Sequence, residues 1–405
     1  MFLRRARVAG ISAVAASIGI ACACSAPPAP IETKAQATAA AAANATGVAT
    51  TGRSDTAKAT AESAGLPGMP PVLDPSNIYA ANRAGNVSPN VARFPQRVYV
   101  PNNVSNTVDV IDPATFKVVD HYEVGRQPQH VTPSYDLQHL WVLNDLGDSV
   151  TEIDPVTSAK GKTTFVKDPY NMYYTPDGQF AIVVAEREQK LNFLNPSTMK
   201  LVESLPVPCR GVDHMDFSAD GRFLIASCEF AGTLLKVDVA ARRTVGTLLL
   251  KAGGMPQDVR SSPDGKVFYV ADMIANGVHV IDPDAFTKID FIPTGKGAHG
   301  IAVSRDAKVM YVSNRGEGSV SVLDFATRKL TAKWQIPGGG SPDMGGLTID
   351  GSTLWLSGRY NAEVYAFDTH DGHLLARIKV GRGPHGLAVF PQPGRYSLGH
   401  NGNYR

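Results

Sequence analysis

A repeat is the feature that most constrains the fold of this chain. From about residue 97 onward, short β-branched and aromatic runs such as RVYVPN, VFYVAD and VMYVSN recur. Their central bulky residues are spaced by 41 to 44 positions: Tyr99, Trp141, Ile182, Ile225, Tyr269, Tyr311 and Trp355. Further short strands follow each run, and the next one usually ends in Asp, as at Asp112 and Asp324. Four short strands in about 40 to 45 residues is the period of a β-propeller blade.

A closed ring is the arrangement that this repeat favours. Each four-stranded sheet has two apolar faces, so every blade needs a neighbour on both sides. A solenoid or a sandwich would be the alternatives, but seven copies without a capping unit favour closure. The last innermost strand, at 385–391, has no partners after it in the chain. We therefore predict that it pairs with residues 97–124 in one blade and closes an all-β, seven-bladed propeller of antiparallel sheets.

The repeat resembles a known family. The stretches YVSNRGEGSVSVLD and YVADMIANGVHVID are similar to the YVTN repeat of seven-bladed β-propellers, and the likeness covers about residues 97–394. The resemblance implies the propeller fold. It does not fix a function, because propellers of this shape have many unrelated activities.

The N-terminus predicts an extracytoplasmic protein. Three arginines precede a short apolar run and small residues, which is the pattern of a secretion signal over 1–24. The end of the run, GIACACSAPP, resembles the lipobox of bacterial lipoproteins, with Cys24 as the first choice for lipidation and Cys22 as the alternative. Residues 25–96 are rich in Ala, Thr and Pro and are expected to form a disordered tether and a transition to the propeller at 97–405. Plain cleavage and secretion is the alternative to anchoring in the cell envelope.

Polar residues recur where the innermost strands begin. In a propeller these strands line the central channel, so we expect one channel mouth to gather the following side chains: His130, Asn171, Asp213, His214, Asp258, His299, Asp343 and His385. Loops on the same face add Asp145, Glu186, Glu229, Asp272 and Arg315. His279, His370 and His400 lie outside this register and are expected on the surface.

The mouth permits three interpretations. It binds a divalent metal through imidazoles, with His130, His214, His299 and His385 as candidate ligands. Alternatively, one histidine acts as general acid or base, as in lactonases or lyases of this architecture. In the third interpretation these residues only line a water-filled channel.

The cysteines of the folded part predict a disulfide. Cys209 precedes an innermost strand, and Cys228 ends the strand expected beside it, so both lie at the same face of one blade. Outside the cytoplasm such a pair oxidises. The loop of about 20 residues corresponds to roughly 3 kcal/mol of stabilisation.

The charge pattern excludes one class of function. The formal net charge is +2 with mixed signs and no basic run in the repeats, which argues against a nucleic-acid binder. The sequence therefore predicts a monomeric, membrane-anchored propeller that acts as a ligand-binding or scaffold module, with an envelope protein as a candidate partner. A lactonase-like or lyase-like enzyme and a metal-binding envelope protein are the alternatives.

Overall fold

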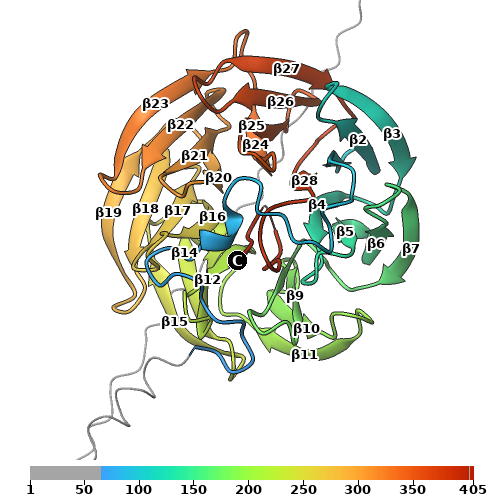
Figure 1. Ribbon diagram of the computed structural model, residues 1–405. Helices are drawn as coiled ribbons and strands as arrows, with labels where there is room; N and C mark the ends of the chain where they lie inside the picture. The colour runs from blue at the N-terminus through green and yellow to red at the C-terminus, as the bar shows by residue number, and fades with distance from the viewer. Residues whose placement is uncertain (1–64, 401) are drawn as a thin grey trace, which may run out of the picture. The chain divides into compact units, whose positions relative to one another are not determined.

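Seven four-stranded antiparallel sheets surround a central channel in the structure, a computed structural model that describes residues 65–400 and 402–405 (Figure 1). The helical elements of these residues are three short 3-10 turns: η1 (Ala80–Asn82), η2 (Asp145–Gly147) and η3 (Glu229–Ala231). The prediction of an all-β, seven-bladed propeller is confirmed.

The first blade joins two distant parts of the chain. From the channel outward it consists of β28 (Ala388–Phe390), β1 (Arg97–Asn102), β2 (Thr107–Asp112) and β3 (Lys117–Glu123). Val98 pairs with Val389, and Tyr99 pairs with Ala388. The predicted closure of the ring by the last innermost strand is therefore correct.

The other six blades each use four strands that follow one another in the chain. The second, third and fourth blades, from the channel outward, are β4 (Pro128–Pro133), β5 (Leu140–Asn144), β6 (Ser149–Ile153) and β7 (Lys160–Phe165); β8 (Asn171–Tyr174), β9 (Ala181–Ala185), β10 (Lys190–Leu194) and β11 (Leu201–Pro206); and β12 (Val212–Phe217), β13 (Phe223–Cys228), β14 (Thr233–Asp238) and β15 (Arg243–Leu249). The fifth, sixth and seventh are β16 (Pro256–Ser261), β17 (Phe268–Asp272), β18 (Gly277–Asp282) and β19 (Thr287–Pro293); β20 (Ala298–Val303), β21 (Val309–Asn314), β22 (Ser319–Asp324) and β23 (Lys329–Gln335); and β24 (Pro342–Leu347), β25 (Thr353–Gly358), β26 (Glu363–Asp368) and β27 (Leu374–Lys379).

Burial follows the position of a strand in its blade. All residues of the inner strands β5, β9 and β17 are buried, whereas the outer strand β15 alternates between exposed and half-buried side chains. Apolar residues of neighbouring blades pack together; Tyr269 of β17 and Met310 of β21, for example, belong to one buried cluster. A strand that is covered on both faces reads as a continuous apolar run, which is why the repeat is visible in the sequence.

The ring has two different faces because successive strands alternate in direction. We call the face with the short turns between the first and second strands of each blade the turn face. The opposite face, with the loops between second and third strands and the connections from one blade to the next, is the mouth face.

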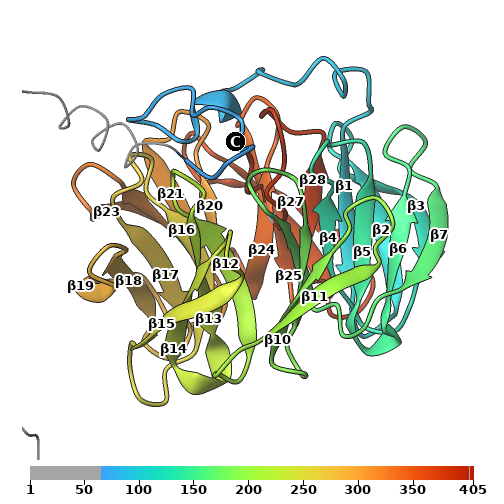
Figure 2. The same ribbon diagram turned by 90° about the horizontal axis from the view of Figure 1, so that it is seen from below.

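Residues 65–96 cross the turn face (Figures 1 and 2). The N–H of Leu66 donates to the carbonyl of Asp220 at 2.7 Å, and the N–H of Ile78 donates to the carbonyl of Pro263 at 2.8 Å. Both acceptors lie in turns of the fourth and fifth blades. These hydrogen bonds attach the segment to the outside of the propeller.

The last segment of the chain enters the channel from the same turn face (Figure 2). Ser397 and Tyr404 form an antiparallel bridge that folds this segment, called the tail here (residues 391–405 except 401), back on itself. The guanidinium of Arg405 lies 3.0 Å from the buried carboxylate of Asp216 in β12. The tail is thus fixed inside the ring by a buried ion pair.

Some predictions fall outside the described residues. These are the secretion signal, the lipidation sites Cys22 and Cys24, and the tether up to residue 64. Among the residues that the structure describes, no helix has the length and apolar character needed to cross a bilayer.

Candidate functional site

β-Bulges at the start of the innermost strands direct polar side chains into the channel. In the fourth blade, Asp213 and His214 of β12 lie opposite the single residue Ser227 of β13, where the pairing register shifts. The same shift occurs at the start of β4, β16, β20 and β24. A bulge bends its strand and changes the direction of a side chain, and bulges are frequent next to functional sites.

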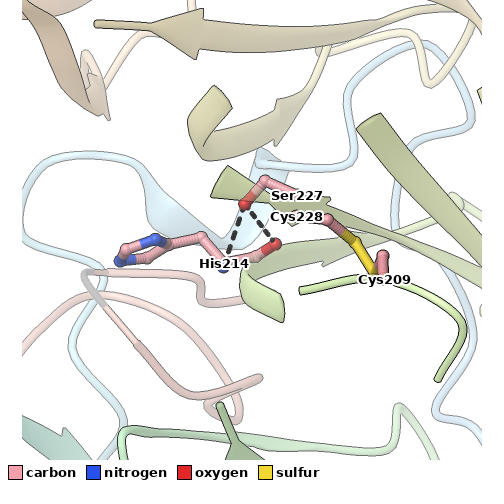
Figure 3. The surroundings of a disulfide bond; sticks show 4 residues. All are labelled: Cys209, His214, Ser227 and Cys228. Carbon is pink, nitrogen blue, oxygen red and sulfur yellow. Dashed lines mark hydrogen bonds between the residues drawn. A yellow bond between two sulfur atoms is a disulfide. The ribbon is translucent and has the colours of Figure 1, made fainter. Parts of the chain in front are cut away.

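In the fourth and sixth blades, a serine hydroxyl group replaces ladder hydrogen bonds that the bulge loses. The Ser227 hydroxyl accepts the N–H of His214 at 3.1 Å and donates to its carbonyl at 3.2 Å (Figure 3). In the sixth blade, the Ser313 hydroxyl accepts the N–H of Gly300 at 2.8 Å. In these two bulges, the hydroxyl group therefore provides a partner for backbone groups that do not pair with the next strand.

The predicted disulfide lies beside this contact. Cys209 and Cys228 are bonded, and Cys228 immediately follows Ser227 at the end of β13 (Figure 3). The prediction from the sequence is confirmed. A structural disulfide is typical of proteins outside the cytoplasm, which is compatible with the predicted extracytoplasmic location.

Five imidazoles cluster in the channel: His130, His214, His299, His385 and His400. The ring centroids of His130 and His400 are 4.3 Å apart, and those of His214 and His400 are 4.7 Å apart. One nitrogen from each of His130, His214 and His400 lies within 4.8 Å of the other two. All three residues are fully buried.

These three histidines have unused hydrogen-bonding capacity. No ring nitrogen of His130, His214 or His400 has a hydrogen-bond partner among the described residues. The Nδ1 of His214 lies 2.6 Å from Oδ1 of Asp213, but without the alignment of a hydrogen bond. Buried polar groups are nearly always hydrogen-bonded or bound to an ion, so a cluster of unpartnered imidazoles is a candidate ligand site.

A second group of the channel is organised around Asp343. Its two carboxylate oxygens lie 2.8 Å from the Nδ1 atoms of His299 and His385, respectively. The Arg315 guanidinium is 3.3 Å from the same carboxylate. On its other side, His385 approaches the hydroxyl of Tyr170 at 3.5 Å. Asp343 therefore orients His385 by a hydrogen bond, whereas His299 lies beside the carboxylate without the alignment of a hydrogen bond.

Burial keeps the channel histidines neutral. Loss of solvent lowers the pKa of His214 to about 4 and the pKa of His299 to about 3. The pKa values of His130, His385 and His400 are also lowered, mainly by burial, and neighbouring imidazoles contribute. The neutral imidazole is the form that binds a transition metal.

Carboxyl groups lie close together on the side of the second, third and fourth blades. Burial, followed by the charges of Asp213 and Glu229, raises the pKa of Glu186 to about 10. Burial also raises the pKa of Asp145 to about 6, and it raises the pKa of Asp213 well above its usual value. Mutual repulsion of buried carboxylates favours either protonation or a bound cation.

The structure places six of the eight predicted mouth residues around the imidazole cluster: His130, Asp213, His214, His299, Asp343 and His385. The other two have structural contacts. Asn171 donates to the Tyr173 hydroxyl at 3.3 Å, and Asp258 accepts the N–H of Ile301 in the next blade at 2.9 Å.

Three other expectations need correction. His400 is fully buried in the channel, and His279 is buried with its Nε2 3.3 Å from Asp272, so neither lies on the surface. His370 is exposed as expected. Asp272 does not belong to the mouth, because its other oxygen accepts backbone N–H groups of its own loop, including that of Ala275.

Some site residues are absent from the sequence prediction. Arg359 occupies the same loop position in the seventh blade as Arg315 in the sixth. Its position in the repeat could therefore have predicted it as a site residue. Tyr170 directly precedes β8 and occupies the repeat position that Asp213 has in the fourth blade, so the repeat could have predicted it as well. The pattern RYSLGHNGNYR around His400 has no counterpart in the repeat. No periodic signal could place His400 in the channel.

Comparisons with known proteins agree with the fold. A family model described as YNCE-like beta-propeller matches residues 58–395. The hydrazine synthase subunit beta of Kuenenia stuttgartiensis is 25% identical over 161 residues, which are 33% of this chain and 42% of that protein. The chain thus matches less than half the length of this curated relative.

Solved structures show the same architecture. A chain of Kuenenia stuttgartiensis hydrazine synthase is similar with a TM-score of 0.58 and 20% identity, covering 70% of this chain and 97% of that one. A functionally unknown protein from Desulfotomaculum acetoxidans is similar with a TM-score of 0.60 and 18% identity, covering 72% and 98%. At this identity the likeness shows the fold alone.

Proposed function

The chain belongs to the YNCE-like beta-propeller family, and we propose that it binds a divalent transition-metal ion inside the propeller channel. The proposed ligands are His130, His214 and His400. The observation that carries the proposal is their geometry: three buried imidazoles converge within 4.8 Å and have no hydrogen-bond partners. Three histidines with an open fourth position are a known ligand set for zinc and related ions.

The surroundings of the cluster support a cation. Asp213 lies beside Nδ1 of His214, which is the position of the carboxylate that usually orients a metal-binding histidine. If Nδ1 carries the proton, Nε2 remains free as the ligand atom. The buried carboxyl groups of Asp213 and Glu186 would regain their charge beside a divalent ion, because the ion offsets their mutual repulsion.

The tail contributes one of the proposed ligands. His400 lies in the segment that Arg405 fixes to Asp216. The site therefore forms only when β4, β12 and the tail are all in place. This arrangement also explains why no short metal-binding motif appears in the sequence: the three ligands are far apart in the chain.

Metal analysis tests this function directly. The purified protein is expected to bind one equivalent of Zn²⁺ or Co²⁺ per chain, and the Co²⁺ form is expected to show visible absorption typical of nitrogen ligands. His130→Ala, His214→Ala and His400→Ala are each expected to abolish this stoichiometric binding. His279→Ala is the matched control, since His279 is a buried histidine that contacts Asp272 rather than this cluster. Unchanged binding by all three channel variants would contradict the proposal.

A second candidate function has one specific observation in its favour. His385 is held by Asp343 at 2.8 Å and faces the Tyr170 hydroxyl, an arrangement suited to a general base and its orienting carboxylate. This supports the lactonase-like or lyase-like alternative. Turnover of simple lactones that disappears in His385→Gln, while metal binding is kept, would favour this function; an equal rate in the variant would exclude His385 as the base.

We also propose that the protein is a lipoprotein of the cell envelope, anchored through Cys24 or Cys22. The disulfide supports an oxidising location. Incorporation of labelled palmitate into the wild-type protein, and its loss in a Cys22→Ser, Cys24→Ser variant, is the expected result. Recovery of unlabelled protein in the medium would instead indicate secretion.

A further inference from the structure

The mouth face carries a ring of exposed apolar side chains. In each blade, the loop after the second strand begins with one residue directed toward the channel mouth, such as Asp145 or Arg315. The following loop position holds a large apolar residue in five of the seven described blades, with 38 to 72% of its surface exposed: Val104, Leu146, Phe230, Ile274 and Tyr360. These exposed apolar side chains therefore all lie on one face of the ring, at equivalent positions of separate loops.

Basic residues lie between these apolar residues. Each connection from an outer strand to the next innermost strand also lies on the mouth face. Six of the seven described connections carry an exposed Arg or Lys: Arg126, Lys167, Arg210, Lys251, Lys296 and Arg382. The apolar and basic positions together are called the rim here.

The rim has an excess of positive charge. Some half-buried acidic residues in its loops have cationic partners: Asp148 contacts the rim residue Lys167 at 2.7 Å, and Glu317 contacts Lys333 at 2.8 Å. The other five basic residues of the rim have no acidic partner among the described residues. Glu188 likewise contacts Lys190 at 3.2 Å. Carboxyl groups nearer the channel are buried or half-buried. The rim therefore attracts an anionic surface.

We propose that the rim docks on a lipid bilayer with anionic headgroups. The apolar residues are separated from one another by basic connections, so they form individual projections and not one dry apolar centre. The centre of a protein–protein interface is depleted of charge, whereas the headgroup layer of a membrane accepts apolar tips and Lys or Arg side by side. The opposite face is covered by residues 65–96 and the tail, which leaves the mouth face as the free one (Figure 2).

Vesicle binding tests this proposal independently of the metal site. The full chain with Cys22→Ser and Cys24→Ser, which cannot be acylated, is mixed with vesicles of phosphatidylcholine alone or with added phosphatidylglycerol. We expect co-sedimentation with the anionic vesicles only, and weaker binding at high salt because salt screens the charges. Absence of binding to anionic vesicles would overturn the proposal and leave the rim to a protein partner.

Rim variants locate the contact. Lys251→Gln, Lys296→Gln and Arg382→Gln together are expected to weaken vesicle binding more than tenfold, since each cation near an anionic surface is worth about a fivefold change. Phe230→Ser, Ile274→Ser and Tyr360→Ser are expected to have a similar effect. The controls are Lys266→Gln with Lys308→Gln, two exposed lysines of the turn face, and Leu201→Ser with Val202→Ser, two exposed apolar residues of an outer strand. Equal effects of rim and control variants would also contradict the proposal.

Discussion

One hydroxyl group, that of Ser227, holds both backbone polar groups of His214. It accepts the His214 N–H at 3.1 Å and donates to the His214 carbonyl at 3.2 Å. Both residues are completely buried, so no solvent can replace these contacts. The position of one proposed metal ligand therefore depends on a serine in the neighbouring strand.

Replacement of this serine is expected to affect both stability and metal binding. Ser227→Ala leaves a buried N–H and a buried carbonyl without partners, which costs about 1 to 3 kcal/mol in the free energy of unfolding. Denaturant unfolding measures that loss, and calorimetry measures the weaker metal binding. Ser313→Ala is the control, because the Ser313 hydroxyl likewise accepts a buried bulge N–H, that of Gly300, and donates to a buried carbonyl, that of Asp343 at 2.6 Å. An equal loss of metal affinity in both variants would contradict the specific role of Ser227 in positioning His214.

A close backbone approach fixes His130. A Cβ atom at Gly386 would collide with Nδ1 of His130, and the backbones of these two residues form a bridge. Gly386→Ala is thus expected to displace the imidazole and to lower metal stoichiometry. Gly346→Ala is the control, since a Cβ there meets only Val389 at 3.9 Å. Full metal occupancy in Gly386→Ala would show that His130 is not a required ligand.

The disulfide is expected to stabilise the propeller. Cys209 and Cys228 are 19 positions apart, and a loop of this size corresponds to about 3 kcal/mol in the loop-entropy description. The Cys209→Ser, Cys228→Ser variant should therefore unfold at lower denaturant concentration than the oxidised wild type. Addition of reductant should shift the wild type toward the variant and leave the variant unchanged. A wild type that does not respond to reduction under unfolding conditions would be inconsistent with this bond.

Stability is expected to fall in mild acid. Burial lowers the pKa of His299 to about 3, whereas an unfolded histidine titrates near 6.5. Below pH 6.5 the unfolded state takes up a proton that the folded state does not, so the free energy of unfolding falls by about 1.4 kcal/mol per pH unit for this residue. Unfolding at pH 7.5 and pH 5 measures the slope, which should be smaller in His299→Gln. His370→Gln, at an exposed position, should retain the wild-type slope.

Glu186 is expected to change the free energy of unfolding with pH in the opposite direction to His299. Its pKa is raised to about 10, so the folded state keeps a proton that the unfolded state releases above about pH 4.5. This residue therefore lowers stability as pH rises from 5 to 7.5 in the absence of a bound cation. Glu186→Gln should increase the gain in stability over that range. If the variant shows a smaller gain than the wild type, the carboxyl group of Glu186 is ionised in the folded protein.

The fold could be predicted from the sequence because the apolar run of each buried strand recurs at a regular spacing. Inner strands such as β17 are apolar on both faces, so the repeat of bulky residues survives at every blade. The pairing of β28 with β1 also followed from the repeat, since the chain ends with an innermost strand that has no following partners. The disulfide followed in the same way, since Cys209 stands just before an innermost strand and Cys228 ends the strand beside it.

The site was predictable only where it follows the blade register. His130 and His214 occupy one repeat position near the starts of innermost strands, His299 and His385 occupy the position before it, and the channel brings all four together. His400 does not, because the tail reaches the channel through contacts such as Arg405 with Asp216 that no local pattern encodes. Asn171 and Asp258 share the register, but the side chain of Asn171 bonds to groups of its own strand and that of Asp258 binds the next blade.

Only three residue pairs connect β28 to β1, and the chain passes from that strand directly into the segment that carries His400. An ion shared by His130, His214 and His400 would thus cross-link two non-adjacent blades to the end of the chain that closes the circle. Because such an ion binds the folded state, the melting temperature should climb with free metal concentration, and chelation should make the circle open more readily.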